Sequence, residues 1–119
     1  MARYLNFKHA DGIYNFSKTV AELLKLSHFK NFKGFGFDGL NESFDIGTIF
    51  EYLKKNKTTG AFFLFTGQIS KEYKEKLEAI VDEVLGAESP RSYIPPYIKY
   101  DGQEDNKKDA LLNLCKPYL

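Results

Sequence analysis

The sequence predicts an α/β or α+β fold: one layered domain over residues 1–119, with about four helices on the faces of a mixed sheet of about four to five strands. Strand-like and helix-like segments alternate along the chain, which favours a layered sheet over a helix bundle or a sandwich. The segment Ala61–Thr66 is apolar on both of its faces, as expected of a central strand that is covered on each side. No linker or repeat divides the chain.

The N-terminal segments predict a hairpin and a helix. Residues 3–7 alternate between polar and apolar side chains, and a turn signal at 9–12 joins them to a short strand at 13–16. Ser17 can cap a helix that ends near His28.

The middle of the chain predicts a strand at 33–38, a helix and then the strand Ala61–Thr66. Asn41, Ser43 or Asp45 can start the helix. Its apolar residues stand at helical spacing and are Ile46, Ile49, Phe50 and Leu53.

The C-terminal part predicts two helices around an extended segment. Ser70 caps the helix with the clearest apolar stripe, and Gly86 ends it. Residues 92–100 are extended, but Pro95–Pro96 lack two backbone donors, so this strand belongs at a sheet edge. We expect the last helix to direct four side chains toward the core, namely Ala110, Leu111, Leu114 and Cys115.

Composition argues against several classes of protein. The net charge of +1, from 17 basic and 16 acidic residues, disfavours a general polyanion binder. The single cysteine, Cys115, can form neither an internal disulfide nor a thiolate metal site, and we expect neither a metal nor another cofactor. No apolar run approaches the roughly 20 residues that span a bilayer, and no signal peptide is recognisable, so we expect a cytoplasmic protein without membrane contact.

The stretch Lys33-Gly34-Phe35-Gly36-Phe37 resembles the strand with which RNA-recognition motifs stack bases. Asp38 follows it where that motif has an aliphatic residue, which favours rings that lie in the core. A binder of RNA or single-stranded nucleic acid is the alternative, and its contact residues would be Lys30, Lys33, Phe35 and Phe37.

Polar loops follow the strands at 33–38 and 61–66. If these strands are parallel, their carboxyl ends lie side by side, where open α/β sheets place ligands. A small enzyme with its site at the loops Asp38–Ser43 and Thr66–Ser70 is therefore a second alternative. The same serines also serve as ordinary helix caps, and the two histidines, His9 and His28, form no catalytic or metal pattern. We assign no catalytic residue, and a role other than catalysis is favoured.

The sequence favours a small protein-binding module, such as an inhibitor or an antitoxin-like immunity protein that occludes a partner protein. Aromatic residues make up 16% of the chain, more ring area than a core of this size needs. Tyrosines on a stiff edge strand suit a protein partner, and an acidic loop can steer it. The predicted contact residues are Asp38, Asn41, Glu42, Asp45, Tyr93, Tyr97 and Tyr100.

The order of elements resembles barstar, a family of ribonuclease-inhibiting immunity proteins, and is loosely similar to regulatory domains of the anti-sigma antagonist type. Gly39 and Asn41, ahead of the helix at 43–56, match the glycine and asparagine at the inhibitory helix of the barstar family. This chain has Ser43 where that family places its first inhibitory acid, and Glu42 and Asp45 stand at other spacings. The resemblance therefore implies no inhibitory residue.

Overall fold

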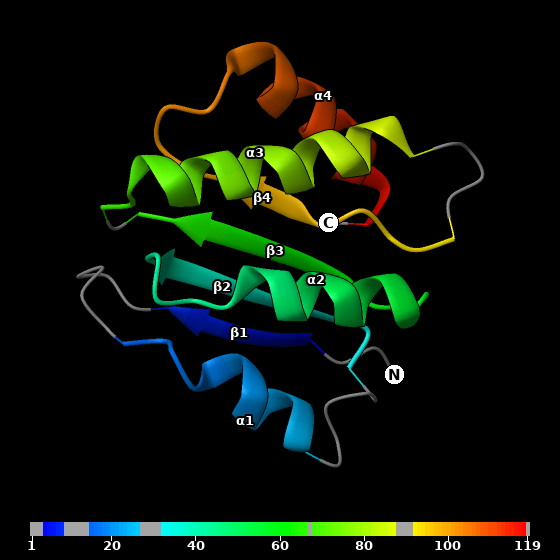
Figure 1. The fold of residues 1–119 in the computed structure, drawn as a ribbon. Helices are drawn as coiled ribbons and strands as arrows, with labels where there is room; N and C mark the ends of the chain where they lie inside the picture. Colours follow the sequence, from blue (N-terminus) through cyan, green and yellow to red (C-terminus); the bar gives the residue numbers. More distant parts are fainter. Residues whose placement is uncertain (1–3, 9–14, 27–31, 67, 88–91, 119) are drawn as a thin grey trace.

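The computed structural model describes residues 4–8, 15–26, 32–66, 68–87 and 92–118, and over these residues strands and helices alternate (Figure 1). The strands are β1 (Tyr4–Lys8), β2 (Gly34–Leu40), β3 (Gly60–Phe65) and β4 (Tyr97–Lys99). The helices are α1 (Thr19–Lys25), α2 (Ile46–Lys55), α3 (Lys71–Gly86) and α4 (Asp105–Cys115), followed by the short 3-10 helix η2 (Lys116–Tyr118). The fold is α/β, as predicted.

The four described strands form one sheet in the order β1-β2-β3-β4, and each neighbouring pair is parallel. The prediction of a mixed sheet is wrong for these strands, because a helix crosses over between each pair and returns the chain in the same direction. The predicted interior position of Ala61–Thr66 is confirmed, since β3 lies between β2 and β4. Residues 9–14 of the predicted hairpin lie outside the described residues, and β1 pairs with β2.

The helices α1, α2 and α3 lie on one face of the sheet, the covered face (Figure 1). The strand order accounts for this, because right-handed crossovers between successive neighbouring strands all pass over the same face. The shortest dimension of the molecule, 20 Å against 36 and 31 Å, fits one layer of helices on one sheet. Among the described residues, no helix has the length and apolar character needed to span a membrane.

The chain around α4 covers the outer edge of the sheet. The amide of Gln103 donates to the carbonyl of Ile98 at 3.0 Å, and the thiol of Cys115 donates to the carbonyl of Pro95 at 3.3 Å. Lys107 joins α4 to α3 through ion pairs with Glu78 and Asp82. The edge strand β4 is thereby shielded from pairing with a further strand.

Phenylalanine rings fill the space between the covered face and the helices. Phe37 of β2 stacks on Phe63 of β3, with ring centroids 6.1 Å apart and planes 7° from parallel. Phe44, which precedes α2, lies against both, at 5.1 Å from Phe37 and 5.7 Å from Phe63. All three side chains are 1% exposed, so this cluster joins the two interior strands to the helix layer.

The face of the sheet away from α1, α2 and α3, here called the opposite face, is packed less completely. Burial alternates along β3: Phe63 and Phe65 are buried, whereas Phe62 and Leu64 are half-buried. Because side chains alternate between the faces of a strand, Phe62 and Leu64 point away from the helices. The expectation that this strand is covered equally on both sides is therefore wrong.

The ring of Phe62 lies directly over Gly36 of the neighbouring strand, where a Cβ atom would overlap it. Gly36 is buried although it has no side chain of its own. Glycine weakens a strand because it contributes no packing, and the ring of Phe62 supplies that packing here.

We predict that Gly36→Ala lowers the free energy of unfolding by about 1–3 kcal/mol, because the new methyl group displaces the Phe62 ring. In a Phe62→Ala background the same change should be neutral or stabilising, since alanine reduces the entropy of the unfolded strand. Urea denaturation of the four variants measures this coupling. Gly86→Ala is the control, because a Cβ there meets no atom within 4 Å. An equal effect of Gly36→Ala in both backgrounds would contradict the proposed contact.

Candidate functional site

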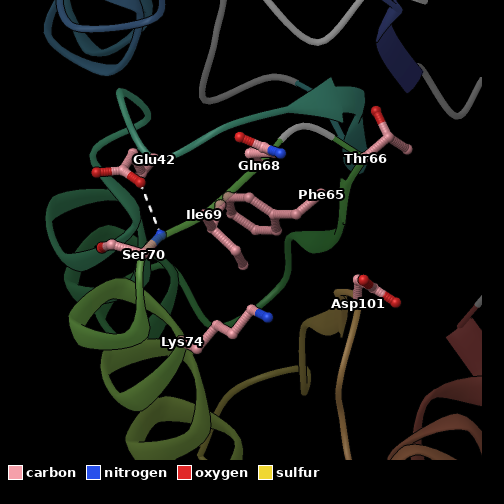
Figure 2. Close-up of a pocket in the computed structure, with 8 residues that line it drawn as sticks. All are labelled: Glu42, Phe65, Thr66, Gln68, Ile69, Ser70, Lys74 and Asp101. Carbon is pink, nitrogen blue, oxygen red and sulfur yellow. Dashed lines mark hydrogen bonds between the residues drawn. The ribbon is translucent and has the colours of Figure 1, made fainter.

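The carboxyl ends of β2 and β3 bring two polar loops together, as their predicted parallel arrangement requires. A carboxylate oxygen of Glu42, in the first loop, accepts a hydrogen bond of 2.7 Å from the backbone N–H of Ser70, in the second (Figure 2). The hydroxyl of Tyr73, in the first turn of α3, donates to the carbonyl of Phe44 at 2.6 Å. These two bonds fix the loops relative to each other.

Most polar side chains of the first loop accept hydrogen bonds from backbone N–H groups. Asp45 is the N-cap of α2 and accepts from the N–H of Thr48 at 3.2 Å, so of the three predicted starts Asp45 is the cap. Asn41 accepts from the N–H of Ser43 at 2.9 Å, and the Ser43 hydroxyl accepts from the N–H of Phe16 at 2.7 Å. Structural roles thus account for much of the polarity that suggested a site.

A cavity of about 580 Å³ opens at the junction of the two loops. Figure 2 shows Phe65 and Ile69 in the middle of its lining, with Glu42 and Ser70 on one side and Asp101 on the other. The remaining lining residues are Thr66, Gln68 and Lys74. The N-terminus of α3 attracts anions, but the carboxylate of Glu42 already occupies this position.

A second cavity, of about 550 Å³, adjoins the first and shares Phe65, Thr66 and Asp101 with it. Side chains of the opposite face, namely Asp38, Leu64 and Lys99, form part of its lining. The start of α4 contributes Asp105 and Lys108. This cavity therefore connects the carboxyl edge of the sheet with the opposite face.

The three predicted contact tyrosines do not form one surface. Tyr93 is half-buried and packs edge-on against Phe50 of α2, with centroids 6.2 Å apart. Ile94, the next residue, lies near Gly60 at the start of β3, so Tyr93 lies at the other end of the sheet from the acidic loop.

Tyr97 is half-buried on β4, and Tyr100 is only 8% exposed. Burial raises the pKa of both phenols above the usual value. Tyr100 belongs to the core and offers little area to a partner. Of the seven predicted contact residues, Asp38 and Tyr97 both point to the opposite face, because each is adjacent to a residue buried on the covered face. They lie on β2 and β4, with β3 between them.

The structure contradicts the geometry that the nucleic-acid alternative requires. Phe35 and Phe37 are 2% and 1% exposed, because both rings point into the covered face, so neither can stack on a base. Lys33 is exposed ahead of β2, and Lys30 lies outside the described residues.

A catalytic arrangement is likewise not found in the described part of the chain. Cys115 is buried and donates to a backbone carbonyl, and His9 and His28 lie outside the described residues. In the described ranges, no group of three His, Cys, Asp or Glu residues is placed to hold a metal ion.

Sequence reasoning missed the opposite face as a candidate site. A continuous apolar strand such as Ala61–Phe65 does not distinguish two covered faces from one, because phenylalanine and leucine occupy both sets of alternating positions. The glycines at 34 and 36 were a usable signal, since they leave one side of β2 without side chains.

We predict that Tyr73 makes the protein less stable at alkaline pH. Burial raises the pKa of Tyr73 above its usual value, and the carboxylates of Asp45 and Glu42 add to the shift. The neutral phenol of Tyr73 therefore has a higher pKa in the folded chain than in the unfolded chain. Below about pH 10 it is neutral in both states and its contribution to stability is complete; above about pH 10 the unfolded chain ionises first and this contribution is progressively lost. The free energy of unfolding should therefore fall less steeply above pH 10 in Tyr73→Phe than in the wild type.

Denaturation in urea from pH 8 to pH 11.5 gives this comparison. Tyr118→Phe is the matched control, since Tyr118 is 50% exposed, and its curve should follow that of the wild type. Parallel curves for Tyr73→Phe and the wild type would show that the Tyr73 phenol is not held neutral by the fold.

Comparisons of the chain with models of protein families, with curated proteins and with solved structures find no match. The resemblance to barstar rests on the order of elements and on Gly39 and Asn41.

Proposed function

We propose that this chain is a protein-binding module and that the opposite face of the sheet is its docking surface. The observation that carries the proposal is a sheet of four parallel strands with three helices on the covered face and half-buried apolar side chains on the other. Sheets made only of parallel strands almost always have both faces covered. A second protein would complete the missing layer.

The chemistry of the opposite face suits a protein partner. Phe62 and Leu64 form its apolar centre, and Tyr97 is the register neighbour of Phe62 on β4. Full burial of a phenylalanine or leucine side chain contributes about 1.5–3 kcal/mol, so covering the exposed parts of these residues favours association. Aromatic residues at the centre with charged residues at the rim are typical of protein interfaces.

Occlusion of a partner, as by an inhibitor or immunity protein, is one form that this function can take. Asp38 and Tyr97 are the predicted contact residues that support it on the opposite face. Asn41, Glu42 and Asp45 hold the loops in place, so substitution of these residues would change the scaffold as well as any interface.

A small enzyme at the carboxyl edge of the sheet is less well supported. Glu42 occupies the N-terminus of α3, and the Ser70 hydroxyl accepts a hydrogen bond from the N–H of Tyr73 as the helix cap. Neither arrangement activates a nucleophile, which would need a neighbouring base.

Photo-crosslinking in cells of the source organism tests the proposed docking surface. With a benzophenone analogue of phenylalanine in place of Leu64, we expect a covalent adduct with a specific protein. The same analogue in place of Glu72, an exposed residue of α3, is the control and should give no such adduct. The assignment fails if position 64 gives no adduct, or only those that position 72 also gives. Mass spectrometry of the peptides in the adduct identifies the partner.

A further inference from the structure

Three residues in one row across the opposite face have complementary chemistry. Asp38 of β2, Leu64 of β3 and Lys99 of β4 are successive register partners, so an acid, an apolar residue and a base follow one another. Each is adjacent in sequence to a residue buried on the covered face, namely Phe37, Phe63 or Ile98, and so points the other way.

The two charges of this row are available to a partner. Strands in a sheet lie about 4.8 Å apart, so the backbones of Asp38 and Lys99 are about 10 Å apart with Leu64 between them. Within the described ranges, neither Asp38 nor Lys99 takes part in an ion pair. Lys8 of β1 is the register partner of Asp38 on its other side.

We infer that the partner is a second copy of this chain, packed with its opposite face against the first about a two-fold axis that runs parallel to β3. This inference rests on the proposed docking function of that face. A two-fold axis in this direction exchanges the β2 side of one sheet with the β4 side of the other. Asp38 of each copy then faces Lys99 of the other, and the two Leu64 side chains meet at the axis.

The charges also select this axis over the alternative. A two-fold axis perpendicular to the strands would place Asp38 opposite Asp38 and Lys99 opposite Lys99, which like-charge repulsion disfavours. The two ends of the next row, Gly36, Phe62 and Tyr97, also differ: Gly36 on β2 has no side chain, whereas Tyr97 on β4 has a large ring. The ring of Phe62 leans over β2, so the parallel axis brings it toward Tyr97 of the other copy.

The size of the face bounds the strength of the dimer. The four strands hold five, seven, six and three residues. At about 3.3 Å per residue and a spacing of about 4.8 Å, the face has a projected area of about 330 Å² in each copy. Over both copies this is about 700 Å², which is below the roughly 1,200–2,000 Å² of stable complexes and belongs with weak, transient contacts. We therefore expect a reversible dimer that dissociates on dilution.

Charge reversal with sedimentation velocity tests the inferred dimer. The wild type should sediment as a dimer at high concentration, whereas D38K alone and K99E alone should be monomeric, because two pairs of like charges face each other. An equimolar mixture of the two variants should form a heterodimer. In it, the lysine introduced at position 38 faces the glutamate introduced at position 99, and the natural Asp38–Lys99 pair is kept on the other side.

Two further variants control this experiment. E72K makes the same charge change as D38K on the exposed face of α3 and should remain dimeric. Leu64→Ser removes the apolar contact at the axis without a change of charge and should be monomeric. Circular dichroism of each variant verifies that it is folded.

The inferred dimer is overturned if the wild type stays monomeric at every concentration, if D38K and K99E still dimerise alone, or if their mixture does not associate. If the dimer is overturned but position 64 crosslinks to a different protein, the proposed docking function is still supported. The docking function itself fails when position 64 gives no specific adduct. The two experiments therefore distinguish failure of the inferred partner from failure of the proposed surface.

Discussion

The stacking of Phe37 on Phe63, with Phe44 packed against both rings, is the interaction on which the rest of the structure depends. It fixes the register of β2 against β3 and assigns alternate residues to the covered face. A slip of one residue would exchange the faces and bring Asp38 into the core. Because the register is fixed in this way, Asp38, Phe62 and Leu64 must all point away from the helices.

This assignment separates two regions that the sequence presents as equally polar and aromatic. At the carboxyl edge, Glu42, Ser70 and Tyr73 bond to backbone groups and join the loops. On the opposite face, Phe62 and Leu64 are only half-buried, although burial would favour them. The region with satisfied polar groups therefore acts as scaffold, and the region with incompletely buried apolar groups is the better candidate for binding.

The sequence predicted the elements better than their arrangement. Helical spacing correctly located α2 and α3. Pro95–Pro96 correctly predicted an edge position for β4, because missing backbone donors are a local signal. The core position of Phe35 was predicted from Asp38, which follows its strand motif, and is confirmed. The face of Phe62 was not predictable, because its strand is apolar throughout and only the strand order decides which side the helices cover. Tyr100 was misjudged for a related reason, since its burial depends on packing among distant segments.

The most direct test of the central claim is hydroxyl-radical footprinting of the dilute protein, with modified residues assigned by mass spectrometry. If β3 presents one face to the helices and the other to a partner, Phe62 and Leu64 should be oxidised while Phe63 and Phe65 are protected. Equal protection of all four residues, or oxidation of Phe63 and Phe65 in preference, would contradict this account of the sheet and of its docking surface.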